Sequence, residues 1–480
     1  MSGSVGVWLR SERTIPRLFL ANLIVALGLI YVTWGKLLGD TESYLGLAEG
    51  ILHGNYSMWW ELPGDYPDTF RTPGFPLFIA VIMNVFGTWK AVIGVNFALY
   101  WLGVLFTLWT IKAIDARPEV RNLFLLLLLP LLNVPFYIGQ IYPEIPSLFA
   151  ISAVLYMLSG KSPIGIGRAF ALGLLYGFIF QCKPIFLLFP FLVPIAGWMA
   201  VRRPFRPKPH LIAAGIFVMT LLPYGIWNRT HHGVFSVTPL EGGAGVMHFG
   251  VWAGKIPGYT EKVYWHNFTG DELVRFTPED SIPAHIREYE QEWAVVNKEL
   301  APLLTANDSL MLASTSLVAH SSSPTYNTAY TLERERLLRK LAIDDAFKWP
   351  GYILALKSYS SVRLWVIGVQ RADFLKASFP KKVELLYGPL STCLIFLMFI
   401  AFVPAAYIKR RVKLKDTWAF LLFLGYFALM HIPFVIQVRY TTPVRFAMLS
   451  ILALALVSLN TKGQEGDCNA ETGEGRVTLP

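Results

Sequence analysis

Long apolar runs alternate with short polar segments along most of the 480 residues of the chain. A helix needs about 20 apolar residues to cross a bilayer, so runs of this length predict membrane-spanning helices. The stretch 75–85 is apolar but only about eleven residues long, and we expect it to lie in the interface or to re-enter the membrane. The spans are expected at 18–36, 89–111, 123–139, 145–159, 166–181, 184–200, 210–227, 386–408, 417–437 and 442–459. The pattern predicts an all-α polytopic membrane protein with about ten transmembrane helices.

Lysine and arginine gather in every second loop between these runs, and such loops face the cytoplasm. The first run follows three arginines without a small-residue cleavage site, so we expect an uncleaved anchor and a cytoplasmic N-terminus. The cytoplasmic loops contain Arg10, Arg13, Arg17, Lys112, Arg117, Arg121, Lys161, Arg168, Arg202, Lys208, Lys409, Arg410, Arg411, Lys413 and Lys415. The outer face then receives the loop 37–88, the turns at 139–144 and at Lys183, the segment 228–385 and the turn 439–442.

This topology divides the chain into four parts. Residues 1–227 form an N-terminal transmembrane catalytic module that includes the first outer loop, and residues 228–385 form an extracytoplasmic insertion of mixed structure. Residues 386–460 supply the C-terminal transmembrane helices. The acidic tail 461–480 is expected to be cytoplasmic and disordered.

The formal net charge of +10 would suit a nucleic-acid-binding protein, but the basic residues lie in short loops and not on one amphipathic face. We therefore expect membrane lipids and no nucleic acid as partners. Three dispersed cysteines form neither a zinc pattern nor a disulfide framework. His231, His232 and His248 lack ligand spacing, so we predict structural or surface roles for them and no metal site. The use of a divalent cation stays open.

Asp40 lies where the first span meets the outer interface. Apolar residues recur at helical spacing after it, and Gly54 is a plausible stop, which predicts an interfacial amphipathic helix over 41–53. Asp40 is then either the N-cap of this helix, with its carboxylate accepting a backbone N–H, or a catalytic acid–base group. Both interpretations stay open at this point.

Glu144 and Lys183 lie in short turns at the same membrane level as Asp40 and Arg71. Four ionisable groups are therefore expected close to one interface. The dipole of a helix N-terminus would also favour Glu144, and Lys183 would also suit a snorkelling anchor.

Carboxylates and cations together suit the transfer of a sugar from a glycosyl phosphate to a hydroxyl group. The phosphate leaving group is a weak base that needs cationic neutralisation, whereas the acceptor hydroxyl needs a carboxylate to take its proton. A lipid-linked donor would explain a site at the edge of the bilayer. Arg439 and Arg445, which flank the last span, could hold a phosphate or a glycan, or could anchor the helix in the interface.

The segment DTESYLGLAEGILHGNY followed by RTPGFPLF closely resembles the first extracytoplasmic loop of GT-C membrane glycosyltransferases. It resembles especially the branch that contains protein O-mannosyltransferases, the lipid A aminoarabinose transferase and related bacterial enzymes. The likeness continues in family order through YPEIPSLFA, KPIFLL, LLPYGIWNRTHHGVFSV, EGGAGVMHFG and RYTTPVRFAML. It touches most of the chain and implies a GT-C-like fold.

The resemblance also implies roles for individual residues. In that family the acidic residue that opens the loop acts as a base or orients the acceptor, which implies this role for Asp40. A second outer acidic residue corresponds to Glu144, and basic residues of such loops bind the lipid phosphate, as Arg71 and Lys183 would here. Many members have two adjacent acidic residues where this chain has Asp-Thr-Glu, so Glu42 either substitutes or faces water.

These features predict an integral membrane glycosyltransferase with Asp40, Glu144 and Glu42 as catalytic residues and Arg71, Lys183 and Arg439 as the donor phosphate site. It would move a sugar from a polyprenyl-phosphate donor to a hydroxyl of a lipid, a glycan or a protein, by direct displacement with inversion, outside a bacterial inner membrane. A transporter or flippase is an alternative, but it should carry ionisable residues near the midplane, where the spans contain no central carboxylate. A polysaccharide polymerase or ligase would share the outer arginines but not the paired carboxylates.

Overall fold

The structure, a computed structural model, is almost entirely helical. It describes residues 4–36, 39–61, 67–159, 164–201, 206–252, 267–268, 294–296, 298–303, 328–348, 350–434 and 437–460. Within these ranges the strands are β1 (Asn267–Phe268) and β2 (Val369–Gln370), which pair antiparallel. The predicted helical class is confirmed, and the tail 461–480 lies outside the described residues.

Helices occupy all ten predicted spans. They are α2 (Thr14–Thr33), α5 (Ala91–Ile114), α6 (Pro118–Leu128), α7 (Glu144–Ser159), α8 (Ile166–Cys182), α9 (Phe189–Val201), α10 (Pro207–His232), α18 (Phe379–Ile408), α19 (Leu414–His431) and α20 (Arg445–Asn460). By length and composition, five helical stretches of the described chain could each cross a membrane: α2, α5, α10, α18 and Val438–Asn460.

Two predicted spans each contain a whole 3-10 helix in addition to an α-helix. In the segment 123–139, α6 ends at Leu128 and a short 3-10 helix, η1 (Pro135–Gly139), follows. In the segment 184–200, a 3-10 helix, η2 (Pro184–Leu188), precedes α9. The cause is proline, which lacks the N–H that continues a helix; Pro130 follows α6, and Pro135 and Pro184 open the 3-10 turns.

The stretch 75–85 forms a separate helix, α4 (Gly74–Phe86). Its 13 residues extend about 20 Å at 1.5 Å per residue, short of the ~30 Å hydrocarbon layer. Such a helix suits an interfacial or re-entrant position, which stays a prediction.

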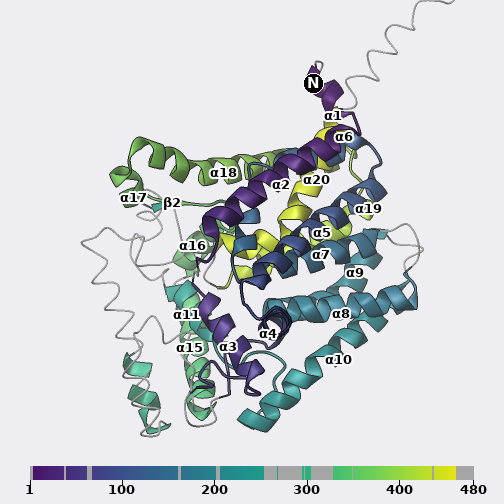
Figure 1. Ribbon diagram of the computed structural model, residues 1–480. Coiled ribbons are helices and arrows are strands. Elements are labelled where there is room, and N and C mark those ends of the chain that lie inside the picture. Colours follow the sequence, from purple (N-terminus) through teal and green to yellow (C-terminus); the bar gives the residue numbers. More distant parts are fainter. Residues whose placement is uncertain are drawn as a thin grey trace, which may run out of the picture.

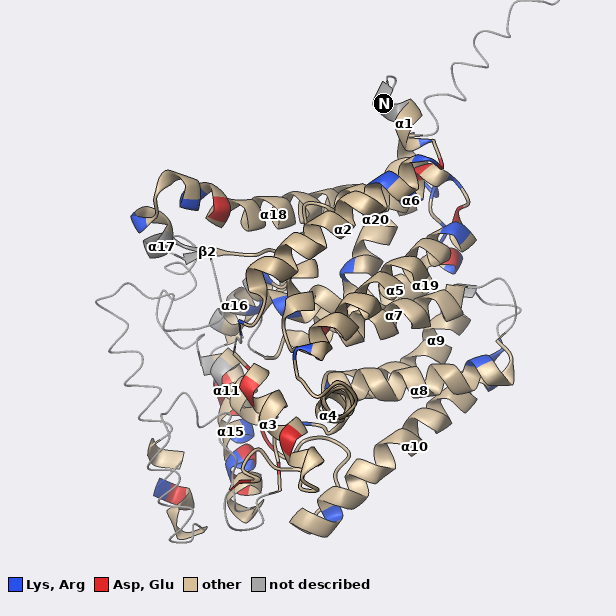
Figure 2. Cartoon of the chain, viewed as in Figure 1, with Lys and Arg blue, Asp and Glu red and all other residues tan. Residues whose placement is uncertain are grey.

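A second group of helices lies beside the bundle, at the end away from the N-terminus and the short helix α1 (Ser4–Leu9) (Figure 1). It contains α3 (Thr41–Leu52), α11 (Gly243–Trp252), α15 (Thr328–Lys348), α16 (Pro350–Arg363) and α17 (Arg371–Lys376). The amphipathic helix predicted over 41–53 is confirmed as α3. Charged residues gather along α15 and at the ends of the bundle (Figure 2).

The helices of the bundle differ in how deeply they are buried. In Val438–Asn460, 83% of the apolar window is buried inside the protein, against 17% in α2. The central helix α20 packs on α5, α6, α18 and α19, whereas α2 exposes several large apolar side chains, including Leu20, Ile24 and Leu27. The turn η7 (Val438–Val444), which leads into α20, packs on α7 and therefore brings a late part of the chain to the start of α7.

Candidate active site

Asp40 lies in the connection between α2 and α3. The preceding residue, Gly39, has φ +50, and a Cβ there would lie 2.5 Å from the hydroxyl of Tyr142. Glycine tolerates this left-handed conformation and close approach, so it lets the chain carry Asp40 against the turn before α7. Asp40 occupies the N-cap position of α3, but its side chain makes no capping hydrogen bond.

The carboxylate of Asp40 binds two arginines instead. Arg439 Nη2 donates to Oδ2 at 2.8 Å, and Arg71 Nη2 lies 3.3 Å from Oδ1. The interpretation of Asp40 as a side-chain N-cap is therefore wrong, because both carboxylate oxygens face guanidinium groups. The arginine from η7 is 399 residues away in sequence, so no local pattern could have revealed this pairing.

Arg71 is fixed by the loop that carries it. The backbone N–H groups of Phe70 and Arg71 donate to Asp68 Oδ2 at 3.0 and 2.7 Å. The carbonyl of Arg71 accepts hydrogen bonds from the hydroxyls of Tyr56 and Tyr224 at 2.9 and 3.0 Å. Three side chains thus hold the backbone of Arg71, so its guanidinium is presented from a rigid turn.

The Arg71 loop is also tied to the second group of helices. The backbone N–H groups of Leu240 and Glu241 donate to the carbonyl of Thr69 at 2.9 and 3.1 Å. Glu241 forms a buried ion pair of 2.5 Å with Arg334 of α15. The position of Arg71 therefore depends on the insertion as well as on the first loop.

Glu144 and Lys183 form a second, deeper pair. Lys183 Nζ lies 3.1 Å from Glu144 Oε1, and the two side chains are 9% and 2% exposed. Glu144 is the first residue of α7, and Lys183 is the extended residue between α8 and η2. The other carboxylate oxygen, Glu144 Oε2, is buried and has no hydrogen-bond partner among the described residues. A buried carboxylate oxygen in this state suits a site that receives a donor group from a ligand or water.

Tyrosine rings join the two pairs into one site. Lys183 Nζ and Arg439 Cζ lie 5.6 and 5.7 Å from the ring centre of Tyr440, and Arg439 lies 4.9 Å from that of Tyr142. Such cation–π contacts hold positive charge without adding negative charge. We call the five residues Asp40, Arg71, Glu144, Lys183 and Arg439 the Asp40 cluster.

The Asp40 cluster contains three cations and two carboxylates, an excess of positive charge in a partly buried site. Burial by itself raises the pKa of Asp40, but Arg71 and Arg439 outweigh it and leave the pKa below the ordinary value of 3.8. Asp40 is therefore ionised at neutral pH. Because the cluster has one more cation than carboxylates and its arginines are fixed in position, it could bind an anion next to an ionised carboxylate.

Five of the six predicted site residues meet in this cluster, and Glu42 does not. It points outward from α3, is exposed, and forms no ion pair with the described residues. Arg445 is fully buried; its Nη2 donates to the carbonyl of Trp365 at 2.7 Å, and its guanidinium lies over that indole ring. The interpretation of Arg445 as an interfacial anchor is therefore wrong.

Sequence reasoning did not single out the tyrosines or Asp68 as parts of the site. Two signals were available: Tyr142 lies two residues before Glu144 and Tyr440 directly follows Arg439, and Asp68 lies three residues before Arg71, a spacing that suits a side-chain turn. Among the histidines, His232 lies 2.9 Å from Thr328 Oγ1 and 3.3 Å from the carbonyl of Asp68 through its two ring nitrogens. In the described ranges no three His, Cys, Asp or Glu side chains form a group that could hold a metal.

No family model and no curated protein matches the chain. Its fold is similar to that of the archaeal oligosaccharyltransferase AglB from Archaeoglobus fulgidus, solved with an inhibitory peptide and a dolichol-phosphate, at 12% identity and a TM-score of 0.45. That match covers 98% of this chain and 53% of AglB, so the chain spans about half the length of that protein. ArnT from Cupriavidus metallidurans is also similar, at 14% identity and a TM-score of 0.35. The match covers 95% of this chain and 81% of ArnT bound to undecaprenyl phosphate, and 92% and 78% for apo ArnT.

Proposed function

We propose that the protein is a membrane glycosyltransferase that moves a sugar from a polyprenyl-phosphate donor to a hydroxyl acceptor. The observation that carries the proposal is the Asp40 cluster, in which one carboxylate is shared by two arginines and a second, buried carboxylate is held by a lysine. An excess cation suits the phosphate of the donor, and an ionised carboxylate suits the proton of the acceptor.

In the proposed reaction the acceptor oxygen attacks the anomeric carbon of the donor sugar. The bond between that carbon and the phosphate oxygen breaks, and polyprenyl phosphate leaves with the electron pair. Asp40 accepts the proton of the acceptor hydroxyl, so charge and atoms balance without a further reactant. A single displacement of this kind inverts the anomeric configuration.

Asp40 is a weak base while two arginines neutralise it, and this suggests an order of binding. A donor phosphate would compete for the guanidinium N–H groups of Arg71 and Arg439. As the phosphate takes over these donors, the pKa of Asp40 should rise from its depressed value and its carboxylate should become a stronger base. Donor binding would therefore prepare the base for the acceptor, and we expect the donor to bind first.

We propose that Lys183 binds the donor phosphate and that Glu144 holds Lys183 in position. Glu144 Oε2, which has no partner among the described residues, would accept a hydrogen bond from a hydroxyl of the donor sugar or of the acceptor. Lys183→Met would leave Glu144 buried and unpaired, at a cost of about 3–5 kcal/mol of stability. Adding Glu144→Gln should restore the melting temperature but not sugar transfer. Recovery of transfer by the double variant would limit this pair to a structural role.

The first test is an assay of the purified protein with a panel of polyprenyl-phosphate sugars, with donor loss followed by mass spectrometry. We expect turnover of at least one donor and its loss in Asp40→Asn. Binding of a lipid-linked substrate without turnover of any donor would favour the transporter.

The proposed site faces the extracytoplasmic side of the membrane. Single cysteines at the exposed positions Glu61 and Lys381 should react with an impermeant reagent in intact cells, and one at Lys413 should not. Reaction at Lys413 alone would reverse the proposed orientation.

A further inference from the structure

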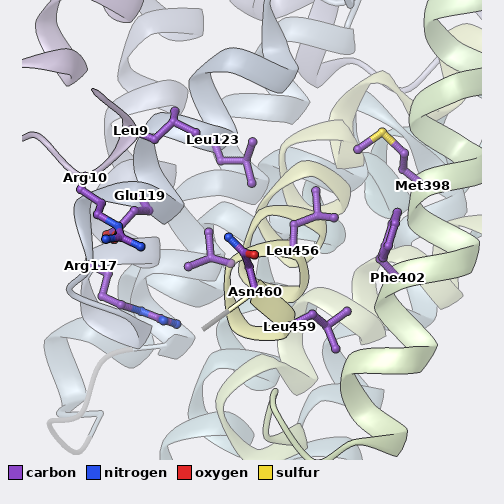
Figure 3. Close-up of a pocket in the computed structure, with 11 residues that line it drawn as sticks. Leu9, Arg10, Arg117, Glu119, Leu123, Met398, Phe402, Leu456, Leu459 and Asn460 are labelled. Carbon is purple, nitrogen blue, oxygen red and sulfur yellow. The ribbon is translucent and has the colours of Figure 1, made fainter. Parts of the chain in front are cut away.

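A cavity of about 480 Å³ lies at the end of the bundle near the N-terminus, between α1, α6, α18 and α20 (Figure 3). One wall is apolar and contains Leu123, Met398, Phe402, Leu456 and Leu459. The other side carries Arg10, Arg117 and Glu119, with Asn460 beside them. The cavity is thus divided into an apolar part and a charged part, and the proposed sugar transfer uses none of its residues.

The apolar wall extends below the level of the basic loop. Phe402 and Met398 lie six and ten residues before the end of α18 at Ile408, which corresponds to depths of about 9 and 15 Å at 1.5 Å per residue. Lys409, Arg410 and Arg411 follow directly. A ligand that fills this cavity has to place hydrocarbon against α18 and α20 and a polar group at the level of the loop, which is how a membrane lipid is built.

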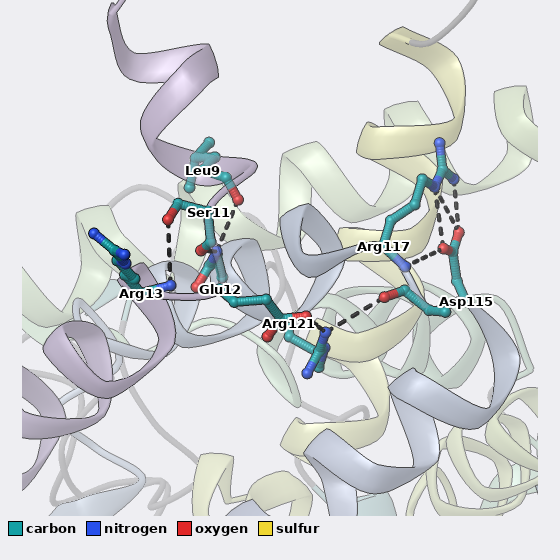
Figure 4. Close-up of polar contacts among 9 residues, drawn as sticks. Leu9, Ser11, Glu12, Arg13, Asp115, Arg117 and Arg121 are labelled. Atoms are coloured by element: carbon teal, nitrogen blue, oxygen red, sulfur yellow. Dashed lines mark hydrogen bonds and ion pairs between the residues drawn. The ribbon is translucent and has the colours of Figure 1, made fainter.

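The charged part contains both signs, because Arg10 and Arg117 line it together with Glu119, while Asp115, outside the lining, pairs with Arg117. Arg10 Nε lies 3.4 Å from Glu119 Oε1. Arg117 Nε and Nη2 lie 3.1 and 2.6 Å from Asp115 Oδ2 (Figure 4). Two guanidinium groups therefore stand beside two carboxylates. A lipid with only negative charge would meet the arginines and the carboxylate of Glu119 together, whereas a headgroup with both signs would satisfy both kinds of side chain.

We propose that this cavity binds a zwitterionic phospholipid with a primary ammonium headgroup, that is, phosphatidylethanolamine. Its phosphate would contact Arg10 and Arg117, and its ammonium would donate to Glu119 and to the side-chain oxygen of Asn460. The quaternary ammonium of phosphatidylcholine has no N–H group and cannot make these hydrogen bonds. The bound lipid would bridge α1 and α6 with α18 and α20, and so stabilise the contact between the two ends of the chain.

The test measures lipid retention and not sugar transfer. The full chain is reconstituted with equal amounts of phosphatidylethanolamine, phosphatidylglycerol and phosphatidylcholine, and retained lipid is identified by native mass spectrometry. We expect preferential retention of phosphatidylethanolamine. The combined change Arg10→Ala and Arg117→Ala should reduce it by roughly tenfold, while the matched control Arg13→Ala, an exposed arginine of the same segment outside the cavity, should not.

Two further variants keep the proposal testable if the double arginine variant does not fold. Leu459→Trp fills the apolar part and should remove the retained lipid. Glu119→Gln keeps the shape of the cavity and should abolish the preference for phosphatidylethanolamine over phosphatidylcholine. Equal retention of the three lipids by the unmodified chain, preference for phosphatidylglycerol, or full retention by Leu459→Trp would overturn the proposal.

Discussion

Two groups of charged side chains at opposite ends of the helix bundle each contain three ion pairs among the described residues, but the balance of charge within them differs. At the N-terminal end, three arginines each have one carboxylate: Arg10 with Glu119, Arg117 with Asp115 and Arg121 with Glu12. We call these the N-terminal pairs. In the Asp40 cluster, two arginines share a single carboxylate and tyrosine rings cover the remaining charge.

The N-terminal pairs have the pattern of charged residues that orient a membrane protein, whereas the Asp40 cluster has the pattern of a site that could bind and react with a ligand. The N-terminal pairs are neutral as a set and include exposed groups such as Glu12, with a side chain 63% exposed, so water screens them. The Asp40 cluster has a cation in excess and a buried carboxylate oxygen without a partner. Of the two arrangements, only the Asp40 cluster has a net positive charge for a ligand that carries negative charge alone.

The largest expected effect is on Asp40. Asp40→Asn keeps the shape of the side chain but removes its basicity, and loss of a general base lowers the rate by roughly 10² to 10⁴. The matched change at the other end, Glu12→Gln, should leave turnover near that of the unmodified protein. Both are measured as kcat with saturating donor, together with a melting temperature. Near-normal turnover by Asp40→Asn would move the search for the base to Glu144.

The second-largest expected effect is on donor binding, when one cation of the Asp40 cluster is removed. Arg439→Ala deletes a guanidinium that contacts Asp40, and the loss of one charged hydrogen bond to a phosphate should raise the donor KM by about 10- to 100-fold. Arg121→Ala removes the ion pair with the exposed Glu12 and a hydrogen bond to the carbonyl of Ala116, both far from the Asp40 cluster, and should not change the donor KM. An equal change in KM for both variants would remove the distinction between the two ends.

A glycine pair tests whether the placement of Asp40 matters. Gly39→Ala and Gly35→Ala both put alanine at a positive φ, of +50 and +72, which costs about 1–2 kcal/mol. Only at Gly39 would the new Cβ meet Tyr142. We expect similar melting temperatures, but a loss of turnover of about tenfold for Gly39→Ala alone. Parallel loss of turnover in both variants would attribute the effect to backbone strain.

The smallest expected effect is a difference in pH dependence between the two ends. Burial raises the pKa of Asp68, in the Arg71 loop, to about 7, whereas the pKa of Asp115 is lowered because its hydrogen bonds to Arg117 outweigh burial. A raised pKa gives stability that is present below the unfolded value and lost as pH rises through the folded value. Asp68 should therefore contribute a fall in stability from about pH 4 to about pH 7, and Asp115 a fall below about pH 4.

Thermal melts across this pH range can separate the two contributions. Asp68→Asn should flatten the fall on the neutral side, and Asp115→Asn should flatten the fall on the acid side. A neutral-side fall that is unchanged in Asp68→Asn would mean that another group causes it.

The sequence predicted which ionisable residues lie at one interface better than it predicted the contacts among them. Asp40, Arg71, Glu144 and Lys183 could be placed together because short turns between apolar runs leave ionisable residues at one interface. Closeness in sequence to Glu144 and Arg439 was not enough to identify Tyr142 and Tyr440 as parts of the site, because a tyrosine at a membrane interface is usually one of an aromatic belt. The direction of Tyr440 also depends on the 3-10 turn η7 that carries it. The break between α6 and η1 was missed because the leucine-rich run hides the effect of Pro130 and Pro135.

The contact between Asp40 and Arg439 has a consequence for biogenesis. The two residues are 399 positions apart, so a ribosome that adds 5–20 residues per second needs roughly 20 to 80 s between them. In the proposed orientation, the nascent chain would by then have its first loop outside the membrane, with Arg71 but without the second arginine. A chain released early by truncation or degradation would lack Arg439, and under the proposed function such an incomplete copy would not consume lipid-linked sugar.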